Sequence, residues 1–129
     1  MRNRINKTLL NAVAANGVGE ADLISDCRHA VIAIDGANSP DLTVKIVGSM
    51  SVEKPDFSAA QSPSNQWDYL QAKDLEDGST IDGDVGLVFA GTADNRQLEI
   101  NTNLVRWVSV VVSGYAAGNV TARLLASTN

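Results

Sequence analysis

Short runs in which hydrophobic and polar residues alternate cover much of the chain, and glycine or other turn residues separate them. Such alternation places the hydrophobic side chains on one face of a β-strand. Residues 29–35 and 42–46 show the pattern most clearly. Asn, Ser, Pro and Asp at positions 38–41 have the composition of a turn. The two runs are therefore expected to form a hairpin. Their hydrophobic positions are Ala30, Ile32, Ile34, Leu42, Val44 and Ile46.

The pattern continues on both sides of this pair. Residues 66–72 predict a weaker strand. Residues 85–90 and 96–101 flank a loop over 91–95, whose Gly, Asp and Asn predict a second hairpin. Residues 5–15 fit either a helix or a strand by composition, and the β-rich context favours a strand or an extended arm.

The longest apolar run, residues 104–115, is hydrophobic on both faces. Val108 and Val110 would lie on one face, and Trp107 and Val111 on the other. An antiparallel strand with one face in water would alternate more regularly. The run is therefore expected either in the middle of the domain, covered on both sides, or with one face buried against another subunit.

Residues 116–119 are expected to turn the chain into a last strand over residues 120–127. Together the runs predict about eight strands, which is typical of a two-sheet architecture. We therefore expect an all-β protein. It would be one antiparallel, jelly-roll-like β-sandwich domain over residues 1–129, with an extended N-terminal arm at residues 1–7.

Composition narrows the classes of function. Ten Lys and Arg against fifteen Asp and Glu give a net charge of −5, which argues against a nucleic-acid partner. No apolar run approaches the roughly 18 residues of a membrane helix, so no membrane partner is expected. A single Cys and a single His cannot form an intrachain disulfide or a structural zinc site. We expect no metal and no cofactor.

Cys27 and His29 are the residues that nucleophilic catalysis would require. They lie two positions apart and would share a face of a strand. Reactive thiols need a basic and accessible setting. A small buried thiol near a solvent-facing imidazole is therefore the favoured interpretation, and no catalytic residue is expected.

The acidic segment over residues 74–84 contains five carboxylates and no basic residue. Such a loop could hold a hard cation, or it could supply an acid pair to a small hydrolase. Its spacing does not fit the helix–loop–helix calcium pattern, and a solvated loop is the favoured interpretation. The acids are Asp74, Glu76, Asp77, Asp82 and Asp84.

Trp67 and Tyr69 would lie on the same face of the weak strand. Two neighbouring rings can form a platform for a glycan. Only six aromatic residues are present in the chain, and aromatic side chains usually fill cores and interfaces. Packing is therefore the favoured role, with glycan contact as the alternative.

Several segments resemble small structural proteins of tailed-bacteriophage particles. These are residues 4–10, 55–62, 65–69, 74–79, 81–84, 104–107 and 118–121. The resemblance brings no catalytic residue. It implies a non-enzymatic virion protein, made in the host bacterial cytoplasm. A decoration (cement) protein on the head surface is favoured, and a tail, neck or fibre component that binds carbohydrate or a receptor is the alternative.

As a decoration protein, the chain would bind the major capsid protein or another virion protein. A homo-oligomer is expected because closed symmetry is the rule for such assemblies, and a trimer would match the local three-fold points of a shell. The basic arm and the doubly apolar strand supply the candidate contacts. The expected interface residues are Arg2, Arg4, Lys7, Arg106, Trp107 and Val110.

Overall fold

The computed structural model describes residues 4–129 as an antiparallel, all-β protein, and no helix occurs in this part of the chain. The expected fold class is confirmed at this level. The more specific expectation of a jelly-roll-like sandwich stays a prediction. The strands are β1 (Arg4–Val13), β2 (Gly17–Val18), β3 (Asp22–Leu23), β4 (His29–Ser49), β5 (Asp68–Tyr69), β6 (Ala72–Asp74), β7 (Thr80–Ile81), β8 (Leu87–Ala90), β9 (Asp94–Ile100) and β10 (Trp107–Ser127).

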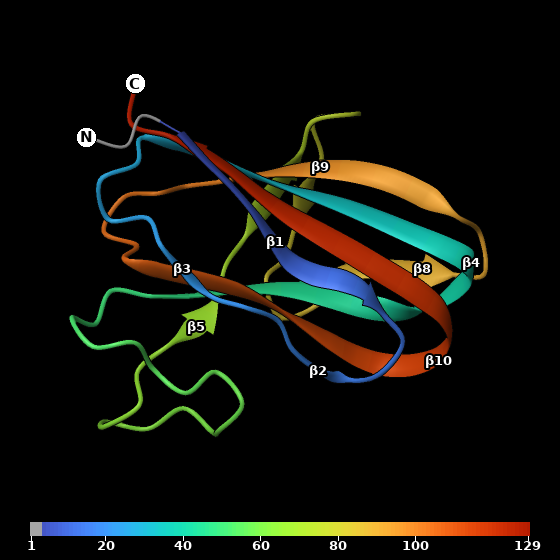
Figure 1. Ribbon diagram of the computed structural model, residues 1–129, viewed down its shortest axis with the longest axis horizontal. Helices are drawn as coiled ribbons and strands as arrows, with labels where there is room; N and C mark the ends of the chain where they lie inside the picture. Colours follow the sequence, from blue (N-terminus) through green and yellow to red (C-terminus); the bar gives the residue numbers. More distant parts are fainter. Residues whose placement is uncertain (1–3) are drawn as a thin grey trace.

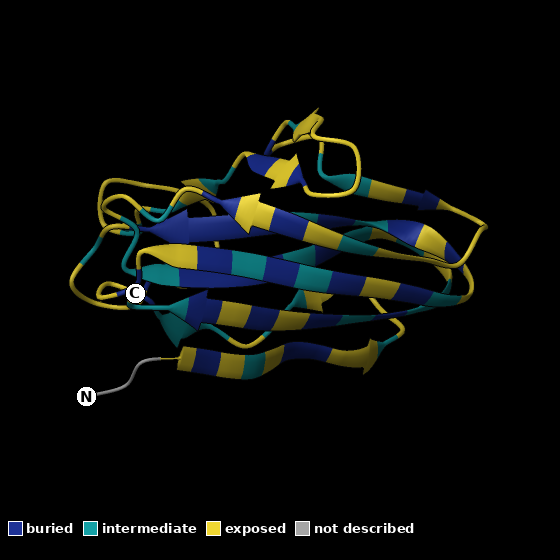
Figure 2. Ribbon diagram, turned by 90° about the horizontal axis from the view of Figure 1, so that it is seen from above, coloured by how far each residue is buried: buried dark blue, intermediate teal, exposed yellow. Residues whose placement is uncertain are grey.

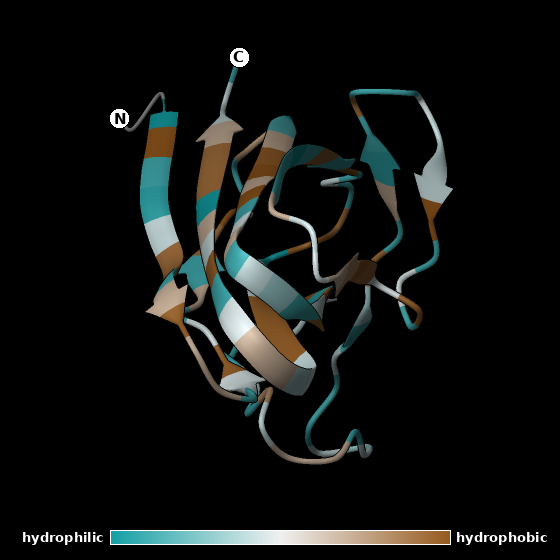
Figure 3. Ribbon diagram, turned by 90° about the vertical axis from the view of Figure 1, so that its right-hand side faces the viewer, coloured by the Kyte–Doolittle hydropathy of each residue, from teal (hydrophilic) through white to brown (hydrophobic). Residues whose placement is uncertain are grey.

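Two long strands, β4 and β10, form the centre of the fold. Each contains 21 residues, and they pair with each other from one end to the other. Both bend sharply at mid-length, where Asn38 and Ser39 of β4 and Gly114 and Gly118 of β10 have positive φ angles. The paired strands thus reverse direction together at one end of the molecule (Figure 1), and Figure 3 views the molecule from that bent end.

The bend divides the sheet into two layers, which we call the first and the second layer. In the first layer, the strand order is β1, the second half of β10, the first half of β4, β9, β6 and β7. In the second layer, β2 and β3 pair with the first half of β10, while β5 and β8 pair with the second half of β4. Every strand outside the β4–β10 ribbon pairs with it directly, except β6 and β7, which extend the first layer beyond β9.

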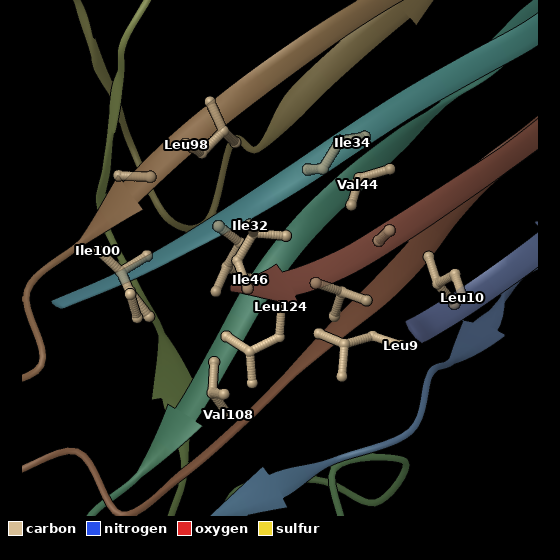
Figure 4. Close-up of a cluster of buried hydrophobic side chains, with 14 of the residues drawn as sticks. Leu9, Leu10, Ile32, Ile34, Val44, Ile46, Leu98, Ile100, Val108 and Leu124 are labelled. Carbon is tan, nitrogen blue, oxygen red and sulfur yellow. The ribbon is translucent and has the colours of Figure 1, made fainter. Parts of the chain in front are cut away.

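The hydrophobic core lies between the two layers. Ile32 and Ile34 come from the first half of β4, and Val44 and Ile46 come from the second half, and all four belong to one buried cluster (Figure 4). Buried and exposed positions alternate along these segments (Figure 2), which confirms the alternation expected from the sequence. Burial of these branched side chains is the main favourable contribution to the fold.

The two expected hairpins are wrong, although their strands exist. Residues 29–35 and 42–46 both lie in β4 and pair with β10, not with each other. Similarly, β8 and β9 pair with different halves of β4, so the chain between them crosses from the second layer to the first. The turn residues reverse the chain into the opposite layer, where each segment finds another partner.

The expected arm is also corrected from Arg4 onward. Residues 4–7 belong to β1, in register from Arg4 opposite Ser127 to Lys7 opposite Leu124. Ile5 is only 6% exposed, because it points into the core between the layers. Arg2 and the rest of residues 1–3 lie outside the described residues.

Other strand limits differ from those expected. The weak strand at residues 66–72 is divided between β5 and β6, and β10 begins at Trp107 and continues through 116–119 without a separate turn. Ten strands are present in the described chain where about eight were expected, because several are only two residues long.

Gly118 holds the two bends together. A Cβ atom at Gly118 would lie 2.6 Å from the Cα of Pro40 and 2.7 Å from the carbonyl oxygen of Ala37. The carbonyl oxygen of Gly118 accepts a hydrogen bond of 2.9 Å from the hydroxyl of Tyr115. The two bent strands can approach this closely only because position 118 carries no side chain.

We expect Gly118→Ala to destabilise the protein by about 3 kcal/mol, from left-handed strain and overlap with the β4 backbone. Gly114→Ala is the matched control. Gly114 also has a positive φ, but a Cβ there would meet nothing within 4 Å, so strain alone should cost about 1 kcal/mol. Urea unfolding measures both. Equal losses would show that the close contact at the bend does not matter.

Candidate interaction surfaces

Three aromatic rings attach the long loop after β4 to the second layer. Trp67 makes edge-to-face contacts with Phe57 at 6.0 Å and with Tyr69 at 5.3 Å between ring centroids. Its indole N–H donates a hydrogen bond of 3.1 Å to the carbonyl oxygen of Ala59. The ammonium of Lys45 lies 5.2 Å from the centroid of the Tyr69 ring. The ring contacts favour packing for Trp67 and Tyr69, and glycan contact by these half-buried rings stays a prediction.

This loop explains part of the doubly apolar character of the second layer. Val47 alternates with the core residue Ile46 and so points away from the core, yet it is fully buried. Phe57 from the loop is also buried, and neither Val47 nor Phe57 belongs to the main core cluster. The indole N–H of Trp107 on β10 donates to the carbonyl oxygen of Val52 at 3.4 Å. The chain thus covers part of its own outer face.

Three large hydrophobic side chains remain exposed beside this loop. Met50 is 65% exposed, Val52 is 74% exposed and Leu104 is 78% exposed. Met50 and Leu104 line a mostly apolar hollow of about 280 Å³, whose wall also includes Trp67. We call Met50, Val52 and Leu104 the apolar patch.

Leu104 is held in the patch by a strained turn. Its φ of +64° lies in the left-handed region, which is unfavourable for a bulky residue. The N–H of Val105 donates to the carbonyl oxygen of Thr102 at 3.2 Å, and the N–H of Asn103 donates to the side-chain oxygen of Asn101 at 2.9 Å. The turn therefore holds the Leu104 side chain in solvent, although burial is the usual place for a leucine side chain.

The expected interface residues lie in different parts of the structure. Val110 is fully buried in the core, so its expected interface role is wrong. Arg106 and Trp107 are half-buried near the apolar patch, and Nε of Arg106 has no hydrogen-bond partner. Arg4 is exposed on the first layer, whereas the ammonium of Lys7 donates to the carbonyl oxygen of Ala21 at 2.8 Å.

Sequence reasoning missed Met50 and Val52 because they lie in a loop, where alternation carries no information. The signal available was the presence of two large apolar residues next to the charged pair Glu53 and Lys54. Apolar residues in a polar loop are typical either of a local cluster or of a contact surface.

Cys27 and His29 have the expected arrangement. Cys27 is 7% exposed, with its sulfur 3.7 Å from a side-chain oxygen of Asp26. His29 is exposed at the start of β4. A buried thiol and a solvent-facing imidazole do not form a pair of nucleophile and general base.

Arg96 of β9 neutralises part of the acidic segment. It forms ion pairs of 2.9 Å with Asp74, 3.3 Å with Glu76 and 2.9 Å with Asp94. A backbone hydrogen bond from Asn95 and the guanidinium of Arg96 lower the pKa of Asp94. The charged form of Asp94 therefore stabilises the fold at neutral pH, and this contribution is lost as acid brings the pH down through its folded-state pKa. Among residues 4–129, no three His, Cys, Asp or Glu side chains group as metal ligands would.

We expect Arg96→Met to lower the melting temperature by several degrees, because it leaves Asp74, which is 4% exposed, without its cation. Glu76→Gln is the control. It removes an ion pair to the same guanidinium, but the Glu76 side chain is 61% exposed, and exposed pairs contribute little. Calorimetry compares the two variants, and similar shifts would contradict a structural role of the buried carboxylate.

The fold is similar to that of a known protein. The crystal structure of the SPBc2 prophage-derived protein YomS matches with a TM-score of 0.69, over 96% of this chain and 92% of that chain, at 14% sequence identity. At this identity the likeness concerns the fold alone. No protein-family model and no curated protein matches the sequence. Residues 4–129 contain no helix long and apolar enough to span a membrane.

Proposed function

We propose that this chain is a non-enzymatic structural protein of a tailed-phage particle. Its favoured role is decoration of the head, where it would bind the major capsid protein and stabilise the shell. The observation that supports the proposal is the likeness in fold to a prophage-derived protein along nearly the whole of both chains. The sequence resemblance to phage structural proteins agrees with it.

The apolar patch supports self-association. Exposed hydrophobic groups of this size are typical of a contact surface. Met50 and Leu104 are exposed and line a mostly apolar hollow, and a contact between identical copies is one way to bury such a surface. We propose that the patch joins copies into a closed oligomer, with a trimer favoured.

The alternative is a tail, neck or fibre component that binds carbohydrate through Trp67 and Tyr69. The ring contacts favour packing over this role, because Phe57 and Tyr69 flank Trp67 and Lys45 lies over Tyr69. Trp67→Ala separates the two ideas. Loss of glycan binding with an intact fold would support the alternative, and loss of stability alone would support packing.

Binding to isolated particle parts tests the proposed role. Labelled protein is mixed with phage heads and with tails from particles that lack it, and co-sedimentation and electron microscopy then locate the label. We expect binding to heads at regular positions on the shell. Binding to tails alone would overturn the decoration role, and binding to neither part would overturn the proposal.

We expect the wild-type protein to be an oligomer in light scattering and Leu104→Asp to be a monomer, because a charge in the patch cannot be buried against a second copy. Val88→Asp is the matched control. Val88 is 59% exposed but lies on β8, outside the patch. An unchanged mass for Leu104→Asp, with both variants folded by circular dichroism, would place the contact elsewhere.

A further inference from the structure

The outer face of the first layer brings together residues that are far apart in the sequence. Register places Arg4 of β1 opposite Ser127 of β10, and Ser127 opposite His29 of β4. Lys73 of β6 lies opposite Glu99 of β9, and Glu99 lies opposite Val31 of β4. Opposed residues of neighbouring strands share a face. These side chains therefore form two adjacent rows on the surface turned away from the core.

A large hollow lies on this surface. Its volume is about 750 Å³, and Arg28, His29 and Lys73 line it together with a single acid, Glu99, among the described residues. The rest of the lining is mainly amide and hydroxyl side chains: Gln71, Thr80, Asn101, Thr102 and Asn103. A second hollow, of about 430 Å³, adjoins it through His29 and extends to Arg4.

The cations of this surface form no ion pair with another described residue, although Glu99 lies opposite Lys73 on the neighbouring strand. Within residues 4–129, every ion pair involves Arg96. Arg4, Arg28 and Lys73 therefore carry charges that face solvent, in a chain whose net charge is −5. We call Arg4, Arg28 and Lys73 the cationic face. Its sign is opposite to that of the whole protein, so an acidic partner would be attracted there while the rest of the surface repels it.

The spacing of the charges indicates what kind of anion fits. The cations lie on β1 (Arg4), just before β4 (Arg28) and on β6 (Lys73), and β1, β4 and β6 are every second strand of the first layer. Neighbouring strands are about 4.8 Å apart, so these cations repeat at about 10 Å across the sheet. A peptide in the polyproline II conformation rises about 3.1 Å per residue and has three residues per turn, so carboxylates three residues apart would lie on one side of it at about that repeat.

Glu99 decides between one compact anion and several separated ones. It lies on β9, between β4 and β6, so it repels an anion placed midway between Arg28 and Lys73. Carboxylates separated along a peptide avoid Glu99 and still reach the cations on either side. The amide and hydroxyl groups of the lining can hydrogen-bond the peptide backbone.

We propose that the cationic face is a docking site for an extended, polyproline-II-like acidic segment of a partner protein, lying across the strands with carboxylates about three residues apart. The chemistry of the site stands without the proposed function. The identification of the partner as a capsid protein rests on the proposed function.

Model peptides test the spacing directly. The probe is a fluorescent Glu-Ser-Ser-Glu-Ser-Ser-Glu peptide, and its isomer Glu-Glu-Glu-Ser-Ser-Ser-Ser carries the same charge without the spacing. We expect the spaced peptide to bind wild-type protein at low salt by fluorescence anisotropy, several-fold more tightly than the clustered isomer, and to weaken as salt rises. Equal affinity for the two peptides, or tighter binding of a thymidine oligonucleotide of the same charge, would overturn the proposal.

Variants identify the residues. Arg28→Gln combined with Lys73→Gln should weaken binding of the spaced peptide about tenfold, in line with the loss of two charge contacts. Lys54→Gln removes an exposed cation from the loop after β4 and should leave binding unchanged. Glu99→Gln should raise the affinity for the clustered peptide most, because it removes the central repulsion. If Lys54→Gln loses as much affinity for the spaced peptide as the double variant does, the charge effect is non-specific and the cationic face is not the binding site.

Head binding by the double variant separates this inference from the proposed function. If the wild-type protein binds the peptide through Arg28 and Lys73 but does not bind heads, the cationic face stands as a binding site and the decoration role is overturned. Full head binding by a double variant that has lost the peptide would leave the decoration role standing and overturn the cationic face as the shell contact.

Discussion

The shared bend of β4 and β10 is the constraint on which the rest of the structure depends. Two strands that remain paired while they reverse direction must bend at the same place and in the same sense. Positive φ angles at Asn38 and Ser39 in one strand and at Gly114 and Gly118 in the other meet this requirement. Gly118 then lets the two backbones touch. Once the ribbon is folded, its two halves face each other across the core and each recruits its own neighbouring strands.

The limits of sequence reasoning follow from this bend. Alternation showed which side chains of β4 face the core, because that depends only on the period of a strand. It could not show which strand lies beside which, because local turn residues suit a hairpin and a change of layer equally well. The same limit explains Val110 and Arg96. A run that is apolar on both faces does not say which face is the core, and an ion pair between β6 and β9 cannot be found before the two strands are placed together.

The candidate surfaces differ in how far the sequence could predict them. The sequence favoured packing for Trp67 and named Trp107 as an interface residue, and the structure shows contacts of both side chains. The cationic face is different in kind. Arg4, Arg28 and Lys73 are separated by more than twenty residues at each step in the sequence, and no local pattern links them. Only the register of five strands brings them to one surface.

If the chain assembles as proposed, the two surfaces take part in different contacts: the apolar patch would join copies of the chain, and the cationic face would bind the shell. The apolar patch lies beside the second layer, and the cationic face lies on the outside of the first. Their hollows meet at Asn103, which lines both, so contacts through the two surfaces would lie side by side. An exposed ionic site is weak by itself and is screened by salt. In a closed oligomer, however, each copy presents the same face to a repeating shell, so that several weak contacts act together and the second and third gain from high effective concentration. Self-association would thus convert a modest electrostatic preference into firm binding, without any single site needing high affinity.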